Sequence, residues 1–255
     1  MRLPMAAKDS GLEFRRLTLS FADTPEHVRE AQRLRYKVFV EATGLSRPAQ
    51  HNGLDHDDFD PYCEHLIVRD SSTAEVVGTY RLLGPNAARR RGRYYSEQEF
   101  DLCKLDRIRA NIAEAGRACI HPAYRSGGVI MLLWAGIAAF MQRENCDYLI
   151  GCASVSLADG GQDAAAIYHG LNEANIGPAD FHVVPRLPYR IRRPDPAHKP
   201  KPPPLIKGYL RTGAWVCGEP AWDPYFNCAD LFMLLPMAKL DNRYARHYLK
   251  EARSL

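Results

Sequence analysis

A glycine-containing turn in the middle of the chain has residue types that could bind phosphate. The turn reads Arg125-Ser126-Gly127-Gly128 and is followed directly by an apolar run of helical length. Free backbone N–H groups at the start of a helix bind anions, and glycine lets a phosphate group approach the backbone closely. The same residues would also suit a tight turn before a core helix, so the turn alone leaves both interpretations open.

Two charged residues of a predicted strand could act together on a substrate. Glu114 and Arg117 are three positions apart and would point to opposite faces of a regular strand. Gly116 lies between them and would permit a β-bulge that brings both side chains to one face. The structural alternatives are a surface salt bridge of Glu114 and a buried ion pair between Glu114 and Arg117.

A further arginine and an acidic segment extend this set of candidates. Arg81 shares a strand face with apolar residues, and its planar guanidinium group could bind a carboxylate through two hydrogen bonds. Residues 55–60 include four aspartates, which are too dense for a strand or for the interior of a helix. We therefore expect a loop at residues 55–60.

Hydrophobic periodicity predicts the elements that would position these residues. Apolar residues at helical spacing predict a helix over residues 25–39, with Thr24 as its N-cap. The arginine-rich residues 89–93 predict a solvated loop. The further predicted elements are strands at residues 65–68, 76–83, 115–120, 148–153, 214–217 and 231–235, and helices at residues 128–144 and 163–173. This order predicts an α/β fold with a mixed sheet packed between helices in a single domain.

The predicted domain spans residues 25–236, between an N-terminal extension of residues 1–24 and a polar C-terminal helix of residues 237–255. Within it, residues 185–204 hold eight prolines and six basic residues, which predicts an extended basic arm. The arm could be a solvated linker, or it could contact an acidic protein or an anionic membrane. Its basic residues are Arg186, Arg190, Arg192, Arg193, Lys199 and Lys201.

Composition and the absence of several motifs exclude other classes of function. A chain of 255 residues with 46% hydrophobic residues and a net charge of +4 is typical of a globular domain, and its charge is too mild to indicate nucleic-acid binding. The seven cysteines form no C-x-x-C pair and no zinc-ligand spacing, and no G-x-S-x-G or H-E-x-x-H motif occurs. Without zinc-ligand spacing we expect no bound metal. No secretory signal is recognisable, so we expect a cytoplasmic protein.

The charged landmarks resemble those of the acyl-homoserine-lactone synthases, which have a GNAT-like fold. The landmarks are Leu34-Arg35-x-x-Val38-Phe39, Asp55-x-Asp57-x-x-Asp60, Gly78-x-x-Arg81-Leu82-Leu83, Phe100 and Glu114-x-x-Arg117. The chain departs from these synthases in Cys63-Glu64-His65, Tyr94-Tyr95-Ser96-Glu97-Gln98-Glu99, Leu205-Ile206-Lys207-Gly208-Tyr209, Gly218-Glu219-Pro220-Ala221-x-Asp223, Phe226 and Asp230. With these features, residues 26–236 resemble the L-ornithine Nα-acyltransferase family of bacterial ornithine-lipid synthesis.

The resemblance implies a reaction and a set of site residues. It implies transfer of a 3-hydroxyacyl chain from acyl carrier protein, or from acyl-CoA, to the α-amine of L-ornithine, with glutamine as the alternative acceptor. No cofactor is expected to be resident. The implied catalytic residues are Glu114 as a base, Arg117, Asp57 and Asp60. The implied substrate-binding residues are Arg35, Phe39, Arg81 and Phe100. The implied donor-binding residues are Cys119, Ile120, Arg125, Gly127, Gly128 and Ser154.

Several of these roles have structural alternatives. Asp57 and Asp60 would hold the substrate's ammonium groups or orient Arg35, unless their loop is simply solvated. The turn at residues 125–128 has the first two fixed positions of the GNAT phosphate loop, but Ile130 stands where that loop has glycine or alanine. The competing functions are another N-acyl-amino-acid or acyl-homoserine-lactone synthase, and a basic binding module without catalytic activity.

Overall fold

The protein is built on one mixed β-sheet with helices on both faces. The computed structural model describes residues 17–41 and 52–239. The sheet has eight strands in the order β1-β2-β3-β5-β6-β10-β8, and β9 also pairs with β10. The strands are β1 (Leu17–Phe21), β2 (Glu64–Asp70), β3 (Val76–Leu83), β5 (Ile112–Ile120), β6 (Tyr148–Ser156), β8 (Trp215–Val216), β9 (Ala221–Asp223) and β10 (Cys228–Pro236). A second, small sheet pairs β4 (Phe100–Asp101) with β7 (Val184–Pro185).

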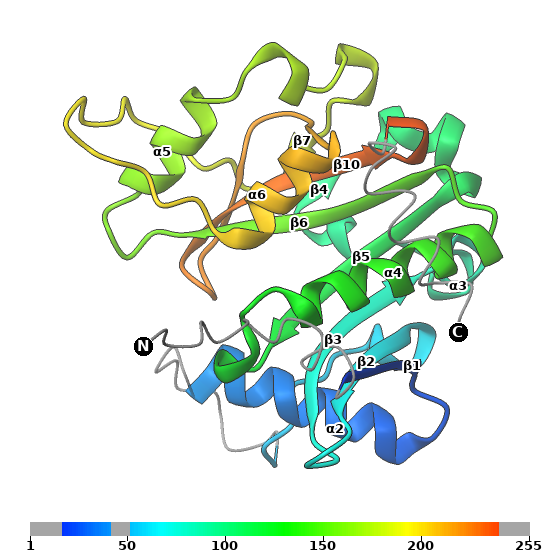
Figure 1. The fold of residues 1–255 in the computed structure, drawn as a ribbon. Coiled ribbons are helices and arrows are strands. Elements are labelled where there is room, and N and C mark those ends of the chain that lie inside the picture. Colours follow the sequence, from blue (N-terminus) through cyan, green and yellow to red (C-terminus); the bar gives the residue numbers. More distant parts are fainter. Residues whose placement is uncertain (1–16, 42–51, 240–255) are drawn as a thin grey trace, which may run out of the picture.

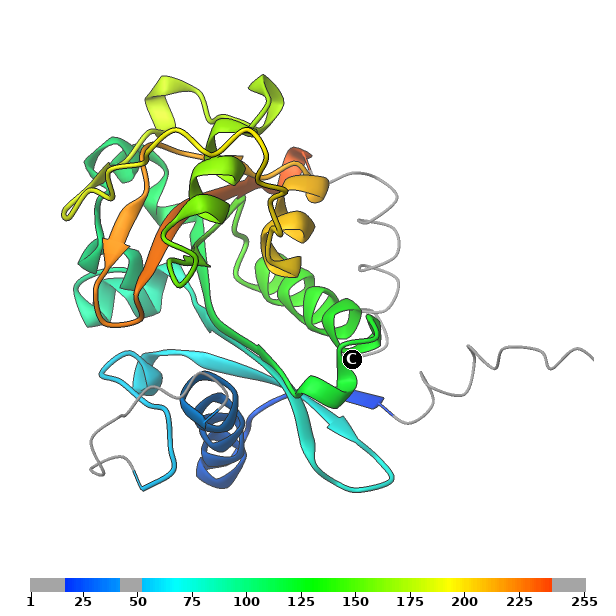
Figure 2. The same ribbon diagram turned by 90° about the vertical axis from the view of Figure 1, so that its left-hand side faces the viewer.

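Two helices cover opposite faces of the sheet (Figure 2). Helix α2 (Pro25–Tyr36) begins at Thr24, whose side chain accepts a hydrogen bond from the N–H of His27. Helix α4 (Gly128–Arg143) is apolar around most of its circumference and packs its buried residues against β1, β2 and β3. The remaining helices are α3 (Pro85–Arg91), α5 (Gln162–His169) and α6 (Pro204–Thr212). The arrangement confirms the predicted GNAT-type mixed sheet between helices.

The sheet forks between its two central strands. Strands β5 and β6 run parallel and pair from Ile112 opposite Tyr148 to Glu114 opposite Ile150, after which they diverge (Figure 1). At the fork the backbones come so close that a Cβ atom on Gly151 would lie 2.4 Å from the carbonyl oxygen of Ala115. A residue with a side chain at position 151 would therefore push the strands apart at this point.

A β-bulge in β5 lies just beyond the fork. Thr79 and Arg81 of β3 face Cys119 and Gly116 of β5, so one residue of β3 opposes two residues of β5. Arg117, one of the two extra residues, has φ +54, in the left-handed region that residues with side chains rarely adopt. The predicted bulge is confirmed, but the residue that takes the unusual conformation is the arginine and not Gly116.

Most of the predicted elements are present, and several boundaries differ. The helix predicted at residues 25–39 ends as an α-helix at Tyr36 and continues as a π-helical turn, Lys37–Glu41. The loop predicted at residues 89–93 is wrong, because α3 covers most of that segment: Pro85 starts the helix and Gly92, at φ +91, ends it. The helix predicted at residues 163–173 stops at His169.

The predicted N-terminal extension contains a strand, whereas the basic arm lacks regular secondary structure, as predicted. Strand β1 lies within the segment assigned to an N-terminal extension and pairs with β2. Residues 186–203 form neither a helix nor a named strand, as their proline content predicts. Most of the predicted C-terminal helix lies outside the described residues.

Candidate active site

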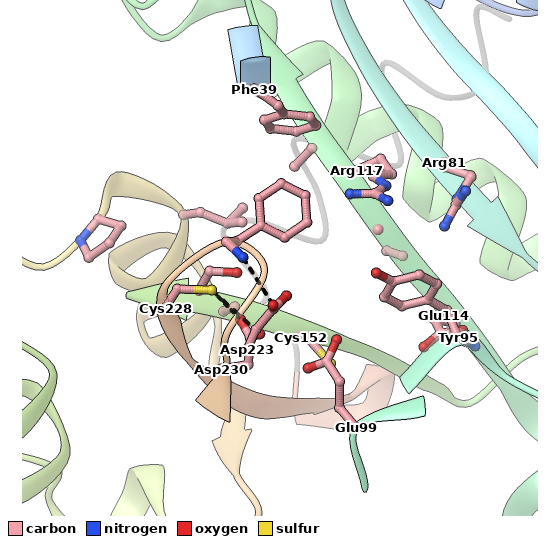
Figure 3. A pocket seen from close by; sticks show the side chains of 18 of the residues that line it. Phe39, Arg81, Tyr95, Glu99, Glu114, Arg117, Cys152, Asp223, Cys228 and Asp230 are labelled. Atoms are coloured by element: carbon pink, nitrogen blue, oxygen red, sulfur yellow. Dashed lines mark hydrogen bonds between the residues drawn. The ribbon is translucent and has the colours of Figure 1, made fainter. Parts of the chain in front are cut away.

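A cavity of about 600 Å³ opens where β5 and β6 diverge (Figure 3). Part of it is lined by small or apolar residues of β5, β6 and α6, such as Ala118, Ala153 and Ile206. Ser154 of β6 and Phe39 also line this cavity. A cavity that combines an apolar lining with charged groups fits a ligand with an apolar portion and a polar reacting end.

A buried ion-pair network fixes the acidic loop beside this cavity. Asp60 binds two arginines: Arg35 Nη2 lies 2.7 Å from Asp60 Oδ2, and Arg81 Nη1 lies 3.0 Å from Asp60 Oδ1. Arg81 Nη1 also lies 2.6 Å from Asp57 Oδ1. Burial alone would raise the pKa of Asp60, but the two guanidinium groups outweigh it and lower that pKa to about 2. The loop is therefore held in place by charge and is not simply solvated.

Arg117 reaches the same network from the bulge in β5. Its guanidinium group lies 3.4 Å from Asp57 Oδ2 and 3.6 Å from Asp55 Oδ1. It also lies over the rings of Tyr95 and Phe226, at 5.6 and 5.7 Å from their centroids. The aspartates of the loop are thus its ion partners, and the alternative of a buried pair with Glu114 is wrong.

Glu114 lines the cavity and is tied to the short 3-10 helix Tyr95–Gln98. Its carboxylate accepts hydrogen bonds from the N–H of Tyr95 at 2.5 Å, from the N–H of Ser96 at 2.7 Å and from the Ser96 hydroxyl. Burial raises the pKa of Glu114, and these donors oppose that rise. Because Glu114 is only 4% exposed, the alternative of a surface salt bridge is also wrong.

Several other predicted site residues lie away from the cavity. Arg35 and Phe100 are completely buried; Arg35 holds the acidic loop and Phe100 packs on Phe232, so the prediction that both contact the substrate is corrected. The thiol of Cys119 is buried and donates to the carbonyl of Leu34 at 3.6 Å. The other predicted donor-binding residues, Ile120, Arg125, Gly127 and Gly128, follow at the end of β5 and the start of α4 and do not line this cavity.

Two histidines have structural contacts. His65 is buried, and desolvation lowers its pKa to about 4, so it is neutral at physiological pH. His121 accepts a hydrogen bond from the N–H of Ala123 at the end of β5. Both therefore support the fold.

A second cavity, of about 590 Å³, adjoins the first. Its rim includes three arginines: Arg91, Arg93 and Arg186. Both cavities are lined by Phe59, Tyr95, Glu99, Arg117, Asp223 and Phe226. An acceptor that enters from one cavity and a donor that enters from the other would meet at these shared residues.

Sequence reasoning missed a group of carboxyls on the far wall of the first cavity. Figure 3 shows Glu99, Asp223 and Asp230 across from Arg81 and Arg117. Asp230 is 2% exposed, and a hydrogen bond joins its carboxyl group to that of Glu99. Burial and the neighbouring Asp230 raise the pKa of Glu99 to about 9. An aspartate in the otherwise apolar strand β10 was a signal that could have identified this wall.

Two groups of side chains have a geometry that could hold a metal ion. Ligand atoms of Asp223, Cys228 and Asp230 lie within 4.8 Å of one another, as do those of Asp159, Asp163 and His198. Burial raises the pKa of the Cys228 thiol. In the second group, His198 and Asp163 bind each other at 2.8 Å.

Comparisons with known proteins agree with the fold. A family model described as an acetyltransferase (GNAT) domain matches residues 34–135. An L-ornithine Nα-acyltransferase of Brucella abortus is 34% identical over 92% of this chain and 90% of its own length. A protein of the same name from Agrobacterium fabrum is 33% identical over 92% of this chain and 86% of its own length.

This chain belongs to the L-ornithine Nα-acyltransferase family. Among solved structures, TofI in a ternary complex with an inhibitor and MTA is similar in fold, with a TM-score of 0.50 and 14% identity over 91% of this chain and 96% of that one. The acyltransferase has no helix, among its described residues, that is both long and apolar enough to cross a membrane.

The ion-pair network of this acyltransferase makes a prediction about stability. We expect Asp60→Asn to lower the free energy of unfolding by about 3–5 kcal/mol at pH 7, because it leaves Arg35 and Arg81 buried with less compensation. Asp58→Asn is the matched control, since the Asp58 side chain is 94% exposed, and it should change stability by less than about 0.5 kcal/mol. Urea unfolding of both variants measures the difference.

The same network predicts a dependence on pH. The pKa of Asp60 is lower in the folded protein than its ordinary value of 3.8, so its stabilising effect is complete above that value and is lost as the pH falls toward 2. The acid-induced loss of stability should therefore be smaller in Asp60→Asn than in the wild type. Equal acid sensitivity in the two proteins would contradict this assignment.

Proposed function

We propose that this protein transfers a 3-hydroxyacyl chain from acyl carrier protein to the α-amine of L-ornithine, which gives a lyso-ornithine lipid. The observation that carries the proposal is the cavity at the fork of β5 and β6, which is lined both by apolar residues and by Arg81, Arg117 and buried carboxyl groups. The apolar lining suits the donor's pantetheine and acyl chain, and the charged groups suit an amino acid. The relatives in its family are named for acyl transfer to the α-nitrogen of L-ornithine.

The reaction needs an acceptor amine held against the thioester carbonyl. We assign Arg117 to the α-carboxylate of the amino acid, because it is at the junction of the two cavities and a guanidinium group can bind a carboxylate through two hydrogen bonds. Arg81 is almost completely buried and bound to two aspartates, so it supports this end of the cavity. The amine nitrogen forms the new C–N bond, the C–S bond of the thioester breaks, and the thiol leaves with a proton.

Proton transfer needs an acceptor for the amine proton and a donor near the thioester. We assign Glu114 as the group that accepts the amine proton through a water molecule, since it lines the cavity as a buried carboxylate. Tyr95 lines both cavities, and burial raises the pKa of its hydroxyl group, which therefore stays protonated. That hydroxyl group is positioned to stabilise developing negative charge or to protonate the leaving thiolate.

The reaction itself is tested with purified components. The protein is incubated with 3-hydroxyacyl carrier protein and with one amino acid at a time, either ornithine or glutamine, and the product mass is measured. We expect N-acylornithine and no product when the amino acid is omitted. Turnover of acetyl-CoA at a rate that does not depend on the amino acid would contradict the proposal, and use of acyl-CoA at equal efficiency would replace the carrier protein as donor.

The role of Glu114 makes a separate prediction. We expect Glu114→Gln to lower kcat about 100-fold in a protein that still folds, as the loss of a general base does. Its Tm should fall, because the amide removes one of the two oxygens that accept from Tyr95 and Ser96. Ser96→Ala removes one donor that stabilises the Glu114 carboxylate, so the pKa of Glu114 rises and the acidic limb of the kcat profile moves to higher pH. Wild-type kcat in Glu114→Gln, or an unshifted profile in Ser96→Ala, would assign the proton to another group.

The basic arm supports a protein donor of opposite charge. The arm is fastened to the start of α5, where Gln162 accepts from the N–H of Asp195 at 2.9 Å and Asp163 accepts from the N–H of Lys201 at 2.9 Å. Arg190, Arg192 and Arg193, which precede the first of these anchors, are exposed. We place the enzyme in the cytoplasm, where an acidic carrier protein would meet this surface, with peripheral contact to the inner membrane.

Charge reversal tests this assignment. Changing Arg190, Arg192 and Arg193 to Glu should raise the KM for acyl carrier protein about tenfold or more at low salt. The defect should shrink as salt shortens the Debye length from about 10 Å at 0.1 M to about 3 Å at 1 M. A small pantetheine thioester is the control donor and should react equally with both proteins. If the KM for the carrier protein is unchanged at low salt and vesicle binding is also unchanged, the arm is only a linker. If the KM is unchanged but vesicle binding is weakened, the arm contacts the membrane and not the carrier protein.

A further inference from the structure

The far wall of the cavity carries more negative charge than the protein neutralises. Glu99, Asp223 and Asp230 all line the cavity, and Asp230 is 2% exposed. Across residues 17–41 and 52–239, no lysine, arginine or histidine forms an ion pair with any of the three. The two neighbouring thiols, those of Cys152 and Cys228, are kept protonated by burial and add no charge. Buried carboxylates without a cationic partner are costly unless a proton or a ligand compensates them.

A shared proton compensates this charge when the cavity holds no cation. Two carboxyl groups form a hydrogen bond with each other only if one of them is protonated, and Glu99 and Asp230 are joined in this way. One oxygen of Glu99, Oε2, is buried and has no hydrogen-bond donor among the described residues. A cationic donor that reached this pair would therefore displace its proton.

Backbone contacts hold Glu99 in this position. It directly precedes β4, and its carbonyl accepts a hydrogen bond from the N–H of Arg186 at 2.7 Å, next to the pairing of β4 with β7. Asp230 comes from β10, at its pairing with Ser154 of β6. The Glu99–Asp230 pair is thus fixed by two separate sheets that face one cavity.

We propose that Glu99, supported by Asp230, recognises the side-chain ammonium group of the amino acid and so selects a cationic substrate. The proposal rests on the function proposed above. Arg117 and the Glu99–Asp230 pair occupy opposite sides of the cavity (Figure 3), so an amino acid bound by its carboxylate at Arg117 directs a terminal ammonium group toward the carboxyl wall. The ammonium donates to Glu99 Oε2 and replaces the shared proton. Glutamine and uncharged amino acids of similar length lack this cation.

An ammonium group suits this wall better than a metal ion does. The trio with metal-like spacing is Asp223, Cys228 and Asp230, and it leaves out Glu99, whose Oε2 is the atom without a partner. The trio also depends on the Cys228 thiol, which burial keeps protonated. A bound divalent cation is nevertheless an outcome that the experiment distinguishes.

The test compares ornithine with norvaline, which has the same carbon chain but no side-chain amine. Values of kcat/KM are measured for both amino acids with wild type, Glu99→Gln and the control Glu75→Gln, since Glu75 is exposed and lines neither cavity. We expect the ornithine-to-norvaline ratio to fall at least tenfold in Glu99→Gln, through a loss on ornithine, and to stay unchanged in Glu75→Gln. An unchanged ratio in a folded Glu99→Gln protein overturns the proposal, whereas failure of the wild type to acylate ornithine overturns the proposed function.

A second measurement needs only the wild-type protein. Because the pKa of Glu99 is raised to about 9, the pair holds its proton at pH 7.5, and ornithine binding should release about one proton. Calorimetry in buffers of different ionisation enthalpy measures this release, which norvaline should not produce. Equal proton release with both amino acids overturns the proposal. So does an ornithine preference that is lost after treatment with a chelator and restored by Zn²⁺, because a metal would then be the cation at this wall.

Discussion

Asp60 is the residue on which the arrangement of the active site depends. It lies between Arg35 of α2 and Arg81 of β3, and through Asp57 the same network reaches Arg117 in the bulge of β5. The ion pairs of this network therefore join a helix, a loop and two strands, and most of the charged groups in it are buried. Such a network contributes little net stability compared with apolar packing, but breaking one partner is costly. Its effect is to fix the position of Arg117.

The fork of the sheet and the ion-pair network both contribute to the position of Arg117. The bulge interrupts the pairing of β5 with β3, which resumes at Cys119, whereas the pairing of β5 with β6 ends at Glu114. The cavity forms where β6 diverges. Arg117 adopts a left-handed backbone conformation, which costs roughly 1–2 kcal/mol for a residue with a side chain. Its ion pairs with Asp55 and Asp57 offset that cost and hold its guanidinium group at the junction of the two cavities.

Local patterns predicted the elements better than they predicted the site. Helices α2 and α4 follow from periodicity and from caps that are close in sequence, and Gly116 indicated the bulge. Helix α3 was missed because its arginines were interpreted as loop residues, although Pro85 and Gly92 are ordinary helix boundaries. The Glu99–Asp230 pair joins residues that are 131 positions apart, and only the completed sheets bring them together. Phe100 was assigned to the substrate by resemblance, but its position behind Glu99 places it in the core.

The long pairing of β10 with β6 determines when during synthesis the enzyme becomes active. Strand β10 is near the C-terminal end of the chain, and it pairs with β6 along nine residues and supplies Asp230 to the cavity wall. While the chain is still being translated, β5, α4 and β6 can assemble, but β6 is then an unpaired apolar edge, which is a hazard for aggregation. Strand β10, which follows the other described strands in the chain, covers that edge and completes the cavity in one step. A truncated chain that lacks β10 would therefore be both inactive and prone to association.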